Sequence, residues 1–120
     1  MTAILIVEDD DEIREILAEM LVDRGYSVVT ARNGQEGLEA MRIPPAPCVV
    51  LLDLMMPIMD GWQLRKEMLA DPALASIPVV IVSGVTDVED KSSSLKAAGI
   101  LTKPVRWPVL LASVRAYCHI

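Results

Sequence analysis

Four short apolar segments of this sequence each end at residues that could do chemistry. An acidic triplet follows the segment nearest the start, and an aspartate, a serine and a lysine follow later ones: Glu8-Asp9-Asp10, Asp53, Ser83 and Lys103. Carboxylates packed into one pocket repel one another unless a cation lies between them. Mg²⁺ suits such a group because it binds carboxylate oxygens together with water and phosphate oxygens. The pattern therefore predicts an acidic cation site.

The same residue types fit phosphoryl chemistry. Beside a bound cation, Asp53 can act as a nucleophile toward a phosphoryl group and form an aspartyl phosphate. Ser83 could donate a hydrogen bond to a phosphoryl oxygen, and Lys103 could pair with another as a compact positive charge. Acidic residues after strands also serve as helix caps, and we expect Asp10 or Asp11 to do so.

The elements that must position these residues alternate between strand and helix patterns. Short β-branched, apolar runs predict strands at residues 4–7, 27–30, 49–52, 79–82 and 100–102. Apolar periodicity and capping residues predict helices at 13–21 with a stop at Gly25, and at 33–41, 61–69, 88–98 and 108–117. The helix at 88–98 has the weakest pattern, because three serines lower its propensity.

This alternation predicts an α/β fold: a doubly wound, five-stranded parallel sheet with helices on both faces. Three of the strands are continuously apolar, as central strands are, whereas those at 27–30 and 100–102 are predicted edges. The pattern fits the flavodoxin-like strand order 2-1-3-4-5, in which ligands bind where strands 1 and 3 end. The four polar segments should therefore converge at one edge of the sheet.

Length and composition limit the class of protein. The 120 residues, 52% of them hydrophobic, suffice for one domain over residues 1–120. A net charge of -6 without a Lys/Arg cluster argues against direct nucleic-acid binding. No segment approaches the roughly 18 apolar residues of a membrane span, and no secretion signal opens the sequence, so we expect a cytoplasmic location.

The cysteines, tryptophans and histidine add little to this interpretation. Cys48 and Cys118 lie far apart and fit neither a zinc site nor a disulfide framework, so we expect reduced, buried thiols. Trp62 and Trp107 are expected to be half-buried packing residues, with Trp107 the better candidate for a partner surface. His119 has no partner nearby in the sequence and receives no role.

Taken together, the whole chain resembles a response regulator receiver domain of the CheY-like type found in two-component signalling. The resemblance rests on "ILIVEDD", "LLDLMMPIMDG", "VVIVSG" and "LTKP", which occur in the family's order. It implies that Asp53 accepts a phosphoryl group from a sensor histidine kinase or a phosphotransfer protein. The chain would then signal to a downstream protein target as a monomer or weak homodimer, and not act as an enzyme beyond self-dephosphorylation.

The resemblance also implies how a metal ion is held. Mg²⁺, or Mn²⁺, would be bound by Asp9, Asp53 and the backbone carbonyl of Met55, with Glu8 reaching the ion through water. Met55 and Val85 are apolar where some receivers have polar residues that orient an attacking water. We therefore expect slow self-dephosphorylation.

The switching residues depart from the family pattern. Ser83 would be the switch hydroxyl and Lys103 the phosphoryl-binding cation, with a cis peptide bond between Lys103 and Pro104. Receivers usually carry an aromatic residue three positions before the lysine, but Ile100 stands there, and the interval from Ser83 to Lys103 is short. A second interpretation therefore stays open: a receiver-like interaction module that acts independently of phosphorylation, with uncoupled switching.

Two rival classes fit less well. A phosphatase of the haloacid dehalogenase type would need a second aspartate two residues after Asp53, where Met55 stands. A flavodoxin-like cofactor carrier would need a phosphate-binding loop after its first strand, and the acidic "EDDDE" would repel a phosphate.

Overall fold

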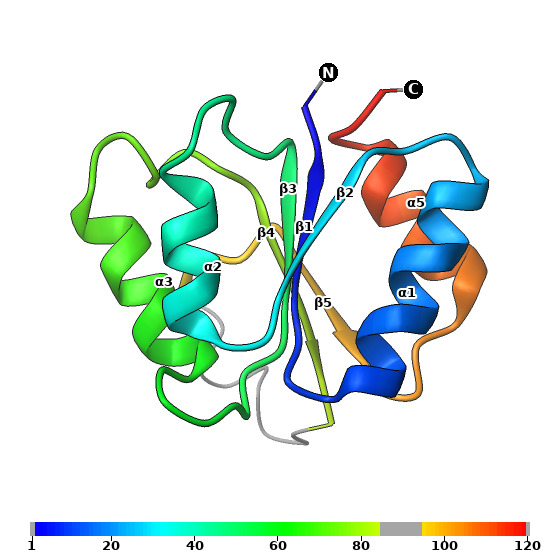
Figure 1. The fold of residues 1–120 in the computed structure, drawn as a ribbon, viewed down its shortest axis with the longest axis horizontal. Coiled ribbons are helices and arrows are strands. Elements are labelled where there is room, and N and C mark those ends of the chain that lie inside the picture. Colours follow the sequence, from blue (N-terminus) through cyan, green and yellow to red (C-terminus); the bar gives the residue numbers. More distant parts are fainter. Residues whose placement is uncertain (1, 85–94, 120) are drawn as a thin grey trace.

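The computed structural model describes residues 2–84 and 95–119 and contains a five-stranded parallel sheet (Figure 1). The elements are β1 (Ile4–Val7), α1 (Asp11–Asp23), β2 (Val28–Ala31), α2 (Gly34–Met41), β3 (Val49–Leu52), α3 (Gly61–Ala70), β4 (Val79–Ser83), β5 (Gly99–Thr102) and α5 (Trp107–Arg115). The strand order is β2-β1-β3-β4-β5, which confirms the predicted topology.

The element bounds differ from prediction by small shifts. Strand β2 begins one residue later than expected, β4 includes Ser83, and β5 begins at Gly99. Helix α5 begins at Trp107, with Pro108 in its first turn, where the missing N–H of proline does no harm. The predicted helix at 88–98 falls for the most part outside the described residues.

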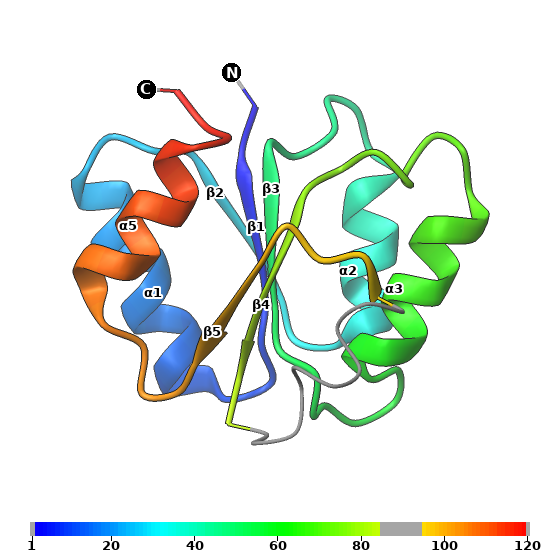
Figure 2. The same ribbon diagram turned by 180° about the vertical axis from the view of Figure 1, so that it is seen from behind.

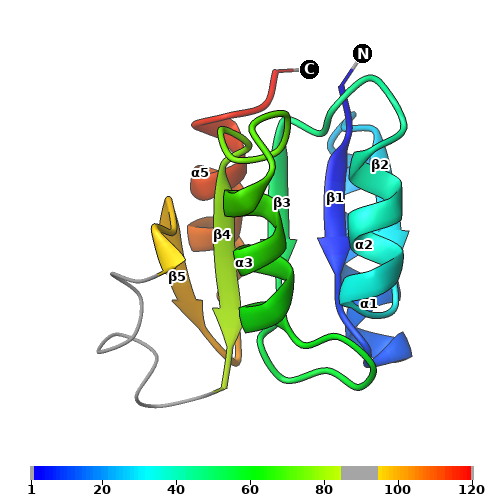
Figure 3. The same ribbon diagram turned by 90° about the vertical axis from the view of Figure 1, so that its left-hand side faces the viewer.

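Two apolar layers cover the sheet. Side chains of successive strand residues point to opposite faces, so alternate residues of β1 join different clusters. Leu5 and Val7 pack with residues of α2 and α3, whereas Ile4 and Ile6 pack with residues of α1 and α5. Figures 2 and 3 show these two helix pairs on opposite faces of the sheet. The burial of every residue of β1, β3 and β4 explains why their sequences are apolar, with Ser83 at the end of β4 as the exception.

Side-chain caps fix where three helices begin. Each cap accepts a hydrogen bond from the backbone N–H three residues on: Asp10 from Ile13, Asn33 from Glu36 and Asp60 from Gln63. Asp10 therefore caps α1, one of the two residues expected to do so. The Glu36 side chain accepts a hydrogen bond from the backbone N–H of Arg32, one residue before the cap.

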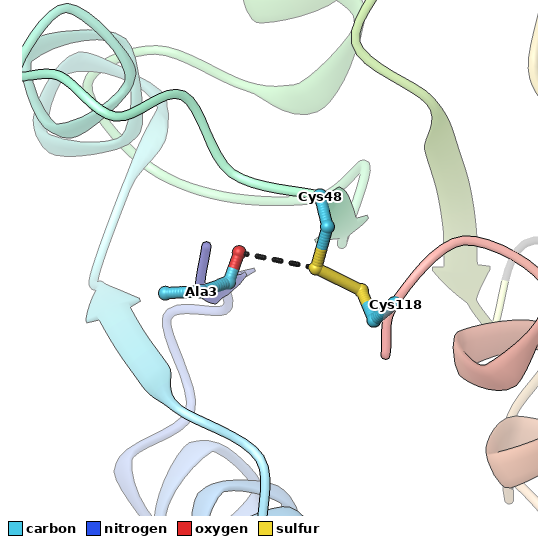
Figure 4. The surroundings of a disulfide bond; sticks show 3 residues. All are labelled: Ala3, Cys48 and Cys118. Atoms are coloured by element: carbon cyan, nitrogen blue, oxygen red, sulfur yellow. Dashed lines mark hydrogen bonds between the residues drawn. A yellow bond between two sulfur atoms is a disulfide. The ribbon is translucent and has the colours of Figure 1, made fainter. Parts of the chain in front are cut away.

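The prediction for the cysteines is wrong: Cys48 and Cys118 form a disulfide bond, with their Cα atoms 5.5 Å apart. Cys48 immediately precedes β3, and Cys118 lies just after α5. The parallel topology brings the starts of strands and the end of α5 to the same edge, which spacing rules along the sequence do not register. Figure 4 shows the bond, with Cys48 Sγ also 3.5 Å from the carbonyl oxygen of Ala3.

Within residues 2–84 and 95–119, none of the helices has both the length and the apolar character that a membrane crossing requires.

Candidate functional site

The predicted site residues meet at the carboxyl edge of the sheet, where the strand arrows end in Figure 1. Glu8 and Asp9 follow β1, Asp53 follows β3, Ser83 ends β4 and Lys103 follows β5. Backbone hydrogen bonds extend the strand ladders to these positions: Glu8 to Ala31 (3.0 Å), Asp53 to Val7 (3.0 Å) and Lys103 to Ser83 (2.9 Å), each N–H donating to a carbonyl. The backbone of the site is therefore continuous with the sheet.

Lys103 bridges two carboxylates. Its Nζ lies 2.7 Å from Glu8 Oε1 and 3.4 Å from Asp53 Oδ2. The Glu8 side chain is 3% exposed and that of Asp53 is 7% exposed, so water solvates neither carboxylate well. An ammonium group between them offsets their mutual repulsion. The structure thus brings these three residues into one charged cluster.

Burial and neighbouring charges shift the pKa values of this cluster. Burial raises the pKa of Glu8, and Asp53 raises it further, while Lys103 acts in the opposite direction. Burial and the Glu8 side chain also raise the pKa of Asp9. Burial by itself would lower the pKa of Lys103, but its interactions with Glu8 and Asp53 outweigh that effect and raise it. The cluster thus favours additional positive charge.

The carboxylates fit a divalent cation. Glu8, Asp9 and Asp53 each offer one oxygen, and these three atoms lie within 4.8 Å of one another. Carboxylate oxygens are the hard ligands that Mg²⁺ and Mn²⁺ prefer. The Lys103 ammonium pairs with two of the three side chains and offsets part of their negative charge. The water-mediated role expected for Glu8 stays a prediction, since its Oε1 pairs with Lys103 and its Oε2 accepts the Asp10 N–H at 3.3 Å.

The loop after β3 contacts the Asp53 carboxylate at the oxygen that does not face Lys103. The Met55 N–H donates to Asp53 Oδ1 at 3.3 Å, while the Met55 side chain is 64% exposed. Leu54 and Met56 are buried beneath the loop. Gly61 allows the chain to return, because a Cβ there would collide with the Asp53 carbonyl oxygen. Met55 is thus adjacent to the acidic cluster through its backbone, and metal binding by its carbonyl stays a prediction.

The residues expected to switch lie on β4 and β5. Ser83 is fully buried at the end of β4, and Ile100 is half-buried on β5 against the core layer of α2 and α3. The Lys103–Pro104 peptide bond is cis, as the family resemblance implied. Val85, the second position expected to slow dephosphorylation, lies outside the described residues.

The sequence interpretation missed Arg14, a buried arginine of α1 beside the acidic loop. Its Nη1 donates to the backbone carbonyls of Glu8 at 2.9 Å and Asp9 at 3.5 Å. A signal was present in the sequence, because this arginine lies at helical spacing on the same stripe as Leu17, Ala18 and Leu21. A charged residue in an otherwise apolar stripe indicates a buried polar contact.

Comparison with known proteins agrees with this geometry. Residues 4–115 match the sequence model described as "Response regulator receiver domain". Protein PilH of Pseudomonas aeruginosa is 36% identical over 118 residues, and the match covers 97% of each chain. The probable transcriptional regulator ycf27 of Guillardia theta is 36% identical over 115 residues, covering 94% of this chain but 44% of that protein. The chain thus spans less than half the length of some curated relatives.

Solved structures give the same result. A response regulator receiver protein from Pseudomonas putida superposes with a TM-score of 0.88 at 29% identity, covering 96% of each chain. The chemotaxis protein CheY4 of Vibrio cholerae superposes with a TM-score of 0.87 at 28% identity, covering 98% of this chain and 99% of that one. The similarity extends over nearly the whole of this chain.

Proposed function

Because the chain belongs to the response regulator receiver family of two-component signalling, we propose that Asp53 accepts a phosphoryl group from a histidine kinase or phosphotransfer protein. The observation that carries the proposal is that Asp53 lies beside the acidic pair Glu8 and Asp9 and within 3.4 Å of the Lys103 ammonium. We propose further that residues 1–120 form one receiver domain, which signals to a downstream protein without directly binding nucleic acid. The monomeric or weakly dimeric state and the cytoplasmic location stay predictions.

The transfer is a substitution at phosphorus. An Asp53 carboxylate oxygen forms a bond to the phosphorus of a phosphohistidine, the P–N bond breaks, and the imidazole leaves with the bonding pair and takes up a proton. Lys103, already 3.4 Å from Asp53 Oδ2, is placed to pair with a phosphoryl oxygen once the carboxylate is phosphorylated. The hydroxyl of Ser83, at the end of the adjacent strand, would donate a hydrogen bond to a second phosphoryl oxygen.

Asp9, Asp53 and the carbonyl of Met55 are the groups that would hold Mg²⁺ or Mn²⁺ in this proposal, and Glu8 would reach the ion through water. Bound there, such an ion would neutralise negative charge on the carboxylates and on the incoming phosphoryl group. Asp53 contributes two separable contacts, because Oδ1 accepts from the Met55 N–H while Oδ2 faces Lys103. These contacts orient the nucleophile before a phosphoryl donor arrives.

An apolar groove beside Lys103 supports contact with a phosphoryl donor. It has a volume of about 450 Å³ and lies between α1 and the segment leading into α5, lined by residues that include Ile13, Met20, Pro104 and Trp107. The Trp107 ring is half-buried, and the Arg24 guanidinium lies over it at 5.7 Å from the ring centre. We therefore keep Trp107 as a candidate partner-surface residue.

The second candidate function is an interaction module that acts without phosphorylation. The observation that favours it is Ile100, whose branched aliphatic side chain is half-buried where the family usually carries a ring. In this alternative, Asp53 is labelled, but labelling leaves the environment of Trp107 unchanged. Tryptophan fluorescence recorded before and after labelling distinguishes the two candidates.

The phosphoacceptor proposal is tested by labelling with acetyl phosphate in the presence of Mg²⁺. We expect stoichiometric labelling of the wild type and none of Asp53→Asn, which keeps the shape of the side chain but loses the nucleophile. Asp10→Asn is the matched control, because asparagine also caps helices well and Asp10 lies outside the proposed metal ligands. Equal labelling of wild type and Asp53→Asn would overturn the proposal.

A further inference from the structure

Arg14 is a buried arginine whose guanidinium faces backbone carbonyls. It lies in the second turn of α1, and its side chain is 11% exposed. Nη1 donates to Glu8 O at 2.9 Å and to Asp9 O at 3.5 Å, and Nη2 pairs with the carboxylate of Asp11. The Asp11 side chain is 77% exposed, so its ion pair with Arg14 is not a buried one. The buried contacts of Arg14 are those with the backbone of the acidic loop.

We propose that Arg14 is a positioning residue for the divalent-cation site: it fixes the peptide groups of Glu8 and Asp9 and so directs their side chains toward Asp53. The proposal rests on the proposed function only for the claim that this cluster binds such a cation. Arg14 binds none of the three carboxylates expected to hold the ion, so its effect passes through the backbone.

The contacts of Glu8 show what this positioning achieves. Its carbonyl oxygen is held by Arg14, its N–H donates to Ala31, and its two carboxylate oxygens meet Lys103 and the Asp10 N–H. Every polar group of this buried residue is therefore bound. Releasing the carbonyl would let the peptide group after Glu8 rotate, and that rotation moves Asp9, which is the next residue and the more exposed member of the pair.

The charge of Arg14 by itself would oppose cation binding, because like charges repel, so the proposed effect comes from the geometry of its hydrogen bonds. Its planar guanidinium donates along fixed directions, which a lysine ammonium does not reproduce. A lysine at this position would therefore keep the charge but lose part of the positioning.

Arg65 provides a matched control. It is 4% exposed, and it also donates to two backbone carbonyls, those of Leu95 at 2.7 Å and Lys96 at 3.2 Å. It lies on α3 and holds a segment that precedes β5, away from the β1–α1 loop. Arg65→Met thus removes a buried arginine with a comparable role in packing but without contact to Glu8 or Asp9.

The test is a titration of the unphosphorylated protein with MgCl₂, followed by backbone amide chemical shifts in NMR spectra. We expect the Kd for Mg²⁺ to rise by about 10-fold or more in Arg14→Met, the range seen when residues that orient metal ligands are lost, and to rise less in Arg14→Lys. Arg65→Met should keep the wild-type Kd, as should Arg32→Met, which removes a nearby but exposed charge. At saturating Mg²⁺, labelling of Arg14→Met by acetyl phosphate should recover most of the wild-type rate.

Two results would overturn the proposal: an unchanged Kd in Arg14→Met, or an equal rise in Arg65→Met, which would indicate general destabilisation. If Arg14→Met does not fold, the Kd for Mg²⁺ is measured in Arg14→Lys instead. An unchanged Kd in that variant contradicts the positioning role. The titration involves no phosphoryl donor, so its outcome is independent of whether Asp53 is the phosphoacceptor. Mg²⁺ binding without labelling of Asp53 would instead contradict the proposed function.

Discussion

The two ends of the sheet carry different kinds of chemistry. At the carboxyl end, charged side chains from three strands meet in a cluster bridged by Lys103. At the amino end, the Cys48–Cys118 disulfide joins the residue before β3 to the segment after α5 (Figure 4). Between them lie the fully apolar strands β1 and β3. The carboxyl end thus holds ion-paired side chains and the amino end holds a covalent cross-link, and the apolar core separates the two.

The separation of the two ends means that stability and chemistry can be altered independently in this molecule. Variants at the amino end should lower the free energy of unfolding and leave labelling intact. Variants at the carboxyl end should change labelling, metal binding or pH dependence. A variant at one end that produces the effect expected of the other would show that the two ends are coupled.

The largest effect is expected from removing the disulfide. Cross-linking residues 70 positions apart restricts the unfolded chain strongly, so Cys48→Ser combined with Cys118→Ser should lower the free energy of unfolding by about 4 kcal/mol. Urea titration measures this change, and the oxidised and reduced wild type provide the control pair. Labelling of the folded double variant at the wild-type rate is also expected. A labelling defect in that variant would show that the two ends are coupled.

Loss of the Lys103 ammonium group, which bridges Glu8 and Asp53, should have the next largest effect, on the labelling rate. Lys103→Met removes the positive charge expected to pair with the phosphoryl group, and we expect the labelling rate to fall by about 10²-fold or more. Lys66→Met, which removes an exposed lysine of α3, is the control. A labelling rate equal to that of the wild type would exclude Lys103 from the proposed transfer.

A smaller effect is expected at the rim of the site. The Met55 side chain is 64% exposed and offers no hydrogen bond to orient a water. Met55→Asn should therefore shorten the half-life of the phosphorylated protein, whereas Met55→Leu should leave it unchanged. The half-life is measured by loss of label after the phosphoryl donor is removed. An unchanged or longer half-life in Met55→Asn would contradict the slow self-dephosphorylation expected of the wild type.

The smallest expected effect is a change in how the free energy of unfolding depends on pH. The pKa of Glu8 is raised above its ordinary value of 4.5, so the folded protein binds a proton that the unfolded chain has released. In metal-free buffer, the free energy of unfolding should therefore decrease as pH rises from about 4.5 through the raised pKa of Glu8. Asp9 contributes in the same direction. Glu8→Gln should make this slope shallower, as measured by urea unfolding at several pH values, and an unchanged slope would exclude Glu8 as its source.

The sequence predicted the fold and the convergence of the site because both depend on local patterns. Apolar runs identified the strands, and parallel strands necessarily end at one edge, which brings Glu8, Asp53 and Lys103 together. The disulfide bond and the hydrogen bonds of Arg14 depend instead on tertiary packing. The two cysteines meet only once α5 packs on the sheet. An arginine in an amphipathic helix gives no indication of which carbonyl it will reach.

The residue that carries the phosphoryl group after labelling decides whether Asp53 is the phosphoacceptor. The protein is labelled with acetyl phosphate and Mg²⁺, digested, and the modified residue is identified by mass spectrometry. We expect a single phosphoryl group on Asp53 and none on Glu8, Asp9 or Ser83. A phosphoryl group found on another residue, or a fully folded, Mg²⁺-binding protein that takes up none, would contradict it.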